Sequence, residues 1–165
     1  MGKVDTEAVA KMALDKAWEI RTSGARVVPM WFLVKGEKVS VLATDWRGES
    51  EKREMVAKVA ARVRERRADA VVFVSDSWVR LRPEGAGPMS AEERHDYLTT
   101  KPSQAVDAME ALVSQVYLRG PSLTLIRAYR QDDAGGLEVV SERHLEGGRH
   151  LGAVAEPVQR AVWGR

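Results

Sequence analysis

The chain has 165 residues, of which 44% are hydrophobic and 30% are charged, and its 26 basic and 24 acidic residues leave a formal net charge of +2. This composition is typical of one globular domain and excludes a chain that stays disordered because it is highly charged and poor in apolar residues. The positive excess is too small to indicate a nucleic-acid partner, and we expect none. The absence of cysteine excludes disulfides, thiolate nucleophiles and cysteine-ligated metals.

Nothing in the sequence indicates a membrane or secretory protein. The longest apolar run, residues 27–34, is too short to cross a bilayer. The first residues, 1–6, are too polar for a secretory signal. A chain without a disulfide framework also suits a reducing compartment. We therefore expect a cytoplasmic protein with no membrane partner.

The first half of the chain predicts a helix followed by a hairpin. In residues 5–22 the apolar side chains recur at helical spacing. The β-rich runs 27–34 and 39–44 follow, and the turn sequence at 35–38 between them indicates a hairpin. Because Pro29 has no backbone N–H, we expect the first strand to lie at a sheet edge or to be bulged there.

A second helix and a buried strand come next. Residues 51–67 carry one apolar stripe and a densely charged outer face, and Ser50 is a good N-cap for them. Residues 70–75 form a short, uninterrupted apolar run rich in β-branched residues. Such a run is typical of a strand that is buried on both faces, so we place it at the centre of the sheet.

Regular patterns stop in residues 82–108, which are interrupted by proline and glycine. Connections of this length are usually functional or mobile. Within it, the capping-box sequence at 90–93 predicts a short helix near 91–98. On its own such a helix is marginal in water, so we expect this segment to become ordered against a neighbouring subunit or partner.

Residues 110–118 fit two structures. Their apolar positions have helical periodicity, and the Gly-Pro pair at 120–121 would end a helix. The same residues fit a strand whose hairpin turn is that Gly-Pro pair and whose partner begins at Ser122. Further on, residues 123–129 and 137–141 predict a strand pair.

We expect one α+β domain over residues 1–142. Residues 143–165 are rich in glycine at their start and predict a C-terminal tail that ends in a short helix, which Pro157 can begin.

Three polar side chains are the candidates for catalysis. Asp45 and Asp76 each follow a predicted strand, and His95 lies in the long connection. Strand ends often carry functional groups because a rigid scaffold holds them. A hydrolase or metal-dependent enzyme could use the three together. The simpler interpretation, which we favour, is that Asp76 satisfies loop amides, because the sequence has no Ser-His-Asp order and no metal-ligand spacing.

The remaining motifs predict no cofactor or metal. Glu92 and His95 share a helix face, but a carboxylate-bridged metal site needs a second such pair, which the sequence lacks. The glycines at 85–87 have neither the third glycine nor the context of a dinucleotide fingerprint. The basic residues at 62–67 suit the last turn of a helix, whose carbonyl end is negative.

The aromatic residues instead indicate a contact surface. Trp46 and Trp78 each follow a strand, and tryptophan is enriched at protein interfaces. Met89, Tyr97 and Leu98 are the large apolar side chains of the long connection. These five residues are our candidates for partner binding.

One stretch of the chain resembles a known group. Residues 68–78 (Ala-Asp-Ala-Val-Val-Phe-Val-Ser-Asp-Ser-Trp), with Pro102-Ser103 and residues 110–113, are similar to small uncharacterised bacterial proteins that have a Val-Ser-Glu-Ala-Trp-like strand end. The resemblance spans residues 25–140 and departs at Asp76, where the group has glutamate. It implies a strand rather than a helix at 110–118.

With that strand, the predicted fold is α+β: a mainly antiparallel sheet of five to six strands with two main helices, in the order α-β-β-α-β-loop-β-β-β. This order is similar to that of profilin-like and roadblock-type domains, which serve as dimerising platforms or ligand sensors. Fold does not determine function. We expect a small protein-interaction or oligomeric assembly module without catalytic activity, whose partner is a protein, most simply a second copy. The enzyme above and a structural component of a virion or other assembly are the alternatives.

Overall fold

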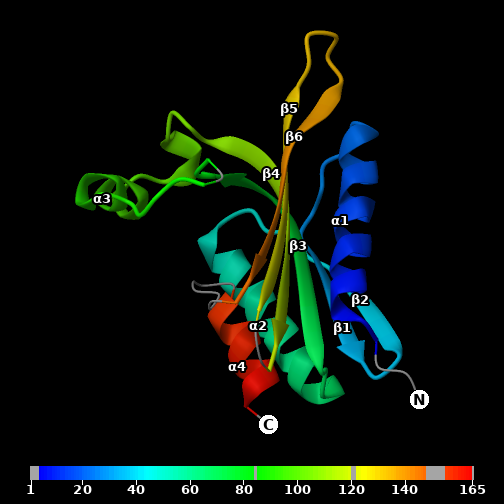
Figure 1. Ribbon diagram of the computed structural model, residues 1–165. Helices are drawn as coiled ribbons and strands as arrows, with labels where there is room; N and C mark the ends of the chain where they lie inside the picture. The colour runs from blue at the N-terminus through cyan, green and yellow to red at the C-terminus, as the bar shows by residue number, and fades with distance from the viewer. Residues whose placement is uncertain (1–3, 84, 120–121, 148–154, 165) are drawn as a thin grey trace.

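The computed structural model of the protein describes residues 4–83, 85–119, 122–147 and 155–164. Six antiparallel strands form one sheet in the order β2-β1-β3-β4-β5-β6, and helices cover both of its faces (Figure 1). The strands are β1 (Met30–Lys35), β2 (Lys38–Ala43), β3 (Ala70–Val79), β4 (Met109–Leu118), β5 (Leu123–Gln131) and β6 (Leu137–Glu146). The helices are α1 (Thr6–Thr22), α2 (Glu49–Arg66), α3 (Ala91–Thr99) and α4 (Ala155–Trp163), with a 3₁₀ turn, η1 (Pro102–Gln104). The predicted α+β class is confirmed.

The helix α1 covers one face of the sheet. It begins after Asp5, whose carboxylate accepts hydrogen bonds from the backbone N–H groups of Glu7 and Ala8. Its buried side chains pack on alternate residues of the central strands, including Val72, Val74 and Leu112. The Ser114 hydroxyl, buried in this layer, donates to the carbonyl of Ala10 at 3.0 Å, so the polar group inside the core has a partner.

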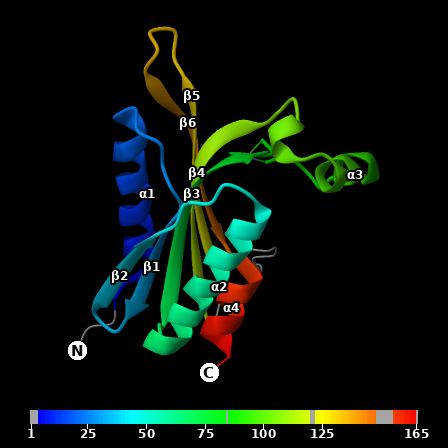
Figure 2. The same cartoon turned by 180° about the vertical axis from the view of Figure 1, so that it is seen from behind.

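The helices α2 and α4 lie side by side on the opposite face (Figure 2). Val56, Val59 and Val63 of α2 pack there with Val158 and Val162 of α4. Two features of the described C-terminal residues differ from the predicted tail, of which residues 148–154 lie outside the described part of the chain. The strand β6 continues to Glu146, five residues beyond the predicted end at residue 141, and the terminal helix is part of the core rather than an appendage.

The strand β3 lies between β1 and β4, as predicted for the buried apolar run. All ten of its residues pair with β4, from Ala70 opposite Leu118 to Val79 opposite Met109. Residues 109–118 therefore form a strand, and the prediction taken from the resemblance is confirmed over the helix that periodicity favoured. The expectation about Pro29 is wrong, because β1 is an interior strand that begins only after this proline.

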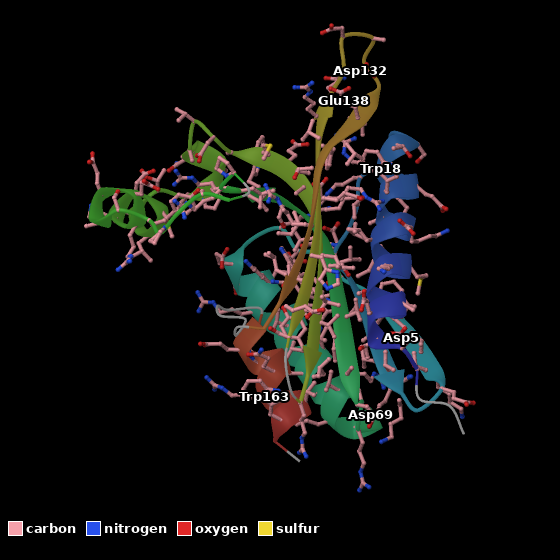
Figure 3. The ribbon with its side chains drawn as sticks, viewed as in Figure 1. Asp5, Trp18, Asp69, Asp132, Glu138 and Trp163 are labelled. Carbon is pink, nitrogen blue, oxygen red and sulfur yellow. The ribbon has the colours of Figure 1, made fainter. Side chains whose placement is uncertain are left out.

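The two ends of the sheet differ. At one end Asp69 accepts hydrogen bonds from the backbone N–H of Gly36 and from Lys35, and the Trp163 indole donates to the carbonyl of Leu118 (Figure 3). The other end opens into two projections. One of them is the β5–β6 hairpin, which extends past the sheet and whose turn is held by the carboxylate of Asp132.

The second projection is residues 80–108, which we call the arm. It leaves the sheet at Val79 and returns at Met109, and these two residues are paired with one another. The helix α3 in the arm is capped by Ser90, as predicted, and none of its residues is buried. The arm projects away from the helical layers (Figures 1 and 2). In the part of the chain that the structure describes, no helix is long and apolar enough to span a membrane.

Arg80 holds the base of the arm together. Its guanidinium donates to Asp96 and to Asp107, each at 2.7 Å, and lies 4.0 Å from the centre of the Tyr97 ring. Arg82 adds a hydrogen bond to the carbonyl of Gly87. Among its described residues the arm is thus organised mainly by charged and polar contacts, and its Leu81 packs on the sheet rather than on other residues of the arm.

Candidate functional site

The edge of β3 is uncovered at the open end of the sheet. The ladder between β1 and β3 ends with Met30 opposite Val74, whereas the ladder between β3 and β4 continues to Val79. Within the described part of the chain, the five residues Ser75–Val79 therefore pair on one side only. The cause lies in the sequence: continuing the register would place Pro29 opposite Ser75, and proline cannot donate a ladder hydrogen bond. The carbonyl of Pro29 instead accepts from the backbone N–H of Thr44 at 2.8 Å.

The gap next to this edge is a cavity of about 500 Å³. Its walls come from the chain before β1, the segment after β2 and the free edge of β3, with Lys52 of α2 and Glu110 of β4. Trp46 packs with the core on the α2 face, whereas Trp78 follows Val72 and Val74 at alternate positions and so points to the α1 face. The two tryptophans therefore flank the free edge on opposite faces.

A polar cluster lies on the α1 face beside this edge. The hydroxyl of Tyr129 lies 2.8 Å from both carboxylate oxygens of Asp76, and Arg21 Nε donates to the Tyr129 oxygen at 3.2 Å. Arg21 is 3.7 Å from the Asp76 carboxylate and 3.9 Å from that of Glu110. Glu110 is opposite Trp78 on one side and Tyr129 on the other, so these three side chains form a row across β3, β4 and β5.

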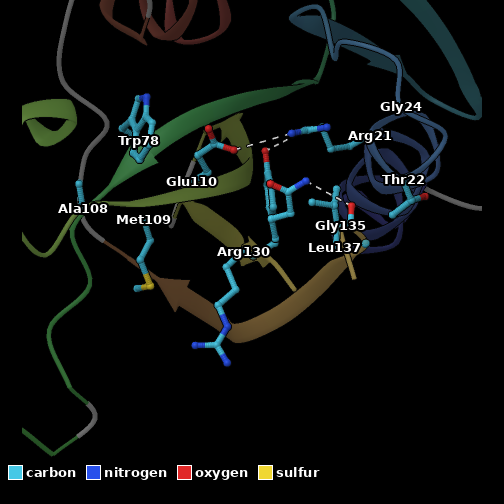
Figure 4. A pocket seen from close by; sticks show the side chains of 13 residues that line it. Arg21, Thr22, Gly24, Trp78, Ala108, Met109, Glu110, Arg130, Gly135 and Leu137 are labelled. Carbon is cyan, nitrogen blue, oxygen red and sulfur yellow. Dashed lines mark hydrogen bonds and ion pairs between the residues drawn. The ribbon is translucent and has the colours of Figure 1, made fainter. Parts of the chain in front are cut away.

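The elements converge here because the last turn of α1 reaches the end of the sheet. Arg21 points from that turn toward Glu110 across a second cavity of about 620 Å³, which shares Trp78 and Glu110 with the first (Figure 4). Tyr129 is held in place by Trp18, whose ring lies edge-on with its centre 5.7 Å away. A β-bulge between Ala128 and Tyr129 interrupts the β5–β6 register at the same point.

The charges of the cluster are not balanced. Burial raises the pKa of Asp76 above its ordinary value, and the neighbouring Glu110 raises it further, while the hydrogen bond from Tyr129 and the charge of Arg21 act in the opposite direction. Burial also raises the pKa of Tyr129, so its hydroxyl stays protonated and remains a donor. The hydrogen bond from Tyr129 and the charge of Arg21 therefore do not fully offset the effects of burial and of Glu110 on the Asp76 carboxylate.

The structure brings together two of the three predicted catalytic candidates. Asp45 and Asp76 line the cavity of about 500 Å³, where Asp45 forms an ion pair with Arg26 at 2.8 Å. His95 lies on α3 in the arm and does not line either cavity. Among the residues that the structure describes, no group of three or more histidine, aspartate or glutamate side chains could hold a metal ion.

The predicted partner-binding residues fall into two groups. Trp46 and Trp78 line the same cavity, and the Trp78 side chain is 48% exposed. Met89, Tyr97 and Leu98 are in the arm, where Leu98 is 80% exposed and Tyr97 lies against Arg80. The structure thus separates the strand-end surface from the arm.

Arg21, Glu110 and Tyr129 were not among the predicted site residues. A signal exists for Glu110, which continues the inward-facing positions of Leu112, Ser114 and Val116 in β4. A charged residue at the end of such a stripe indicates a polar site under the edge of the core. This signal can be recognised only once residues 109–118 are known to form a strand and the register of that strand is known. The sequence pattern was compatible with both a strand and a helix there.

Comparison with known proteins gave no matching family model, no matching curated protein and no matching solved structure. The resemblance to the small bacterial group with a Val-Ser-Glu-Ala-Trp-like strand end stays a prediction.

Proposed function

We propose that this protein is a protein-interaction module that takes up an extended segment of a partner protein along the free edge of β3. One observation carries the proposal: Ser75–Val79 are paired with β4 only, and their other edge faces a cavity of about 500 Å³. An extended peptide can add to such an edge through main-chain hydrogen bonds, and flanking pockets then select its side chains.

The surroundings of the edge support this mode of binding. An added strand would lie beside Ser75–Val79, past the point where the β1–β3 ladder stops at Met30 and Val74. Its side chains would alternate between the two faces of the sheet. On one face they would meet Trp46 and Phe73, and on the other Trp78. Aromatic anchors of this kind commonly dominate binding energy in protein interfaces.

The enzyme hypothesis has less support. It requires Asp45, Asp76 and His95 to converge, and His95 lies in the arm, outside the cavity that the two aspartates line.

A blocked heptapeptide of alternating valine and threonine is the probe that tests the proposal. We expect it to produce saturable NMR shifts in the backbone amides of residues 75–79 and in the indoles of Trp46 and Trp78. The same peptide with N-methylated backbone amides keeps its side chains but cannot add as a strand, so it should produce none of these shifts.

Protein variants complete the test. Trp78→Ala should weaken binding of the heptapeptide by about tenfold, because a half-exposed aromatic anchor is lost. Met12→Ala is the matched control, since Met12 on α1 is exposed to a similar extent. Equal binding of the two peptides, or shifts confined to the arm, would rule out strand addition at β3.

A further inference from the structure

We infer that the segment bound at the β3 edge carries a lysine or arginine, whose cationic group lies on the α1 face between Trp78 and the carboxylates of Asp76 and Glu110. The inference rests on the proposed function, because it concerns the side chains of the segment that adds to β3. It names the chemical class of residue that the site selects.

The position of the added strand sets where this side chain must lie. Directly opposite residues of neighbouring antiparallel strands have Cβ atoms about 4.5–5.5 Å apart. A residue opposite Asp76 or Trp78 would point to the same face as they do. Asp76, Trp78 and Glu110 all line the cavity that would hold it. The stem of a lysine or arginine is long enough to bring its charge to all three side chains.

The acidic side chains on the α1 side of the cavity outnumber the basic side chains that pair with them. Arg26 is paired with Asp45 at 2.8 Å. Lys52 lines the cavity on its α2 side, beside Trp46, and lies 3.8 Å from Glu49. On the α1 face the two carboxylates of Asp76 and Glu110 share the single guanidinium of Arg21, at 3.7 and 3.9 Å. That guanidinium also donates to Tyr129. The local balance is therefore one negative charge in excess.

Partial burial strengthens the attraction that this excess negative charge exerts on a cation. The side chains of Asp76 and Glu110 are only 26% and 40% exposed, so water screens them less than it screens a surface carboxylate. The raised pKa of Asp76 agrees with this, because burial and Glu110 outweigh the hydrogen bond from Tyr129 and the charge of Arg21. The exposed face of Trp78 adds a second attraction, since aromatic rings bind cations above their faces.

Three heptapeptides that differ only in their central residue test the inference. With lysine, norleucine and glutamate at that position, isothermal titration calorimetry at low salt should give an affinity for the lysine peptide about tenfold above that for the norleucine peptide. The glutamate peptide should bind more weakly than both. The preference for lysine should shrink in high salt, since it is electrostatic.

Variants locate the preference. Glu110→Gln should remove most of the difference between the lysine and norleucine peptides. Glu37→Gln makes the same change in net charge at an exposed turn far from the site, so it should keep the difference. Equal binding of lysine and norleucine peptides would overturn the inference and leave the proposed function standing. If no peptide binds, both fail.

Discussion

At the scale of one residue, Asp76 links the polar cluster to the stability of the folded protein. Its pKa is raised in the folded protein, so the folded state binds the proton more tightly than the unfolded state does, where the pKa is about 3.9. Stability from this group is therefore greatest at low pH and falls as the pH rises through the folded pKa. At neutral pH the charged carboxylate is a net burden on folding.

This reasoning predicts that Asp76→Asn raises the melting temperature at pH 7, because the amide oxygen still accepts from Tyr129 and the buried charge is gone. The gain should be a few degrees and should vanish below about pH 4, where the wild-type carboxyl is itself protonated. Melting curves from pH 4 to pH 8 measure it. Asp133→Asn removes a carboxylate at the exposed hairpin tip and should leave the melting temperature at pH 7 unchanged. A lower melting temperature for Asp76→Asn at pH 7 would contradict the prediction.

Single residues also show where sequence reasoning stopped. Asp76 and Trp78 could be identified because they follow an obvious buried strand. Arg21 and Tyr129 could not, because each lies in an element whose pattern only shows that it packs on the core. Their contact with Asp76 depends on where α1 ends over the sheet and on the register of β5. Long-range geometry of that kind has no local signature.

Among the elements, β3 is the one on which the rest of the sheet depends. Val72 is fully buried in the layer under α1, and an unpaired charge there costs several kcal/mol against a total stability of about 5–15 kcal/mol. We predict that Val72→Asp leaves no cooperative folding transition. Val41→Asp, on the exposed side of the edge strand β2, should change stability by less than about 1 kcal/mol. Urea denaturation followed by circular dichroism compares them, and a cooperative transition in Val72→Asp near that of the wild type would show that β3 is not central.

The strand β4 explains why periodicity alone was misleading. Leu112 and Val116 face α1, while Ala111 and Tyr117 are buried on the opposite face. Because the strand is apolar on both faces, its apolar residues at positions 109, 112, 113 and 116 repeat at helical spacing. The end of β6 was missed for the opposite reason: it is an edge strand with mostly exposed side chains, so residues 142–146 show no apolar alternation.

At the scale of the whole molecule, the arm is the part least supported by the core. None of the residues of α3 is buried, and Leu98 and Val106 are largely exposed. We predict that the arm packs against a second copy of the protein and that the amides of residues 89–98 are protected from hydrogen exchange only at high protein concentration. Leu98→Asp should weaken self-association in sedimentation velocity by about tenfold, and Met12→Asp should not. Strong protection of residues 89–98 in a verified monomer would contradict this.

The arm is attached to the sheet at Val79 and Met109, and this attachment does not determine how long the arm must be. Since these residues face one another on neighbouring strands, their backbones lie about 5 Å apart. A tight turn could join the same two positions, so neither strand fixes the length of what connects them. Insertions, deletions or a wholly different sequence between these two points would leave the pairing of every other strand intact. This molecule therefore has a natural grafting point, where a lineage or an engineer can install new binding sequences without refolding the scaffold.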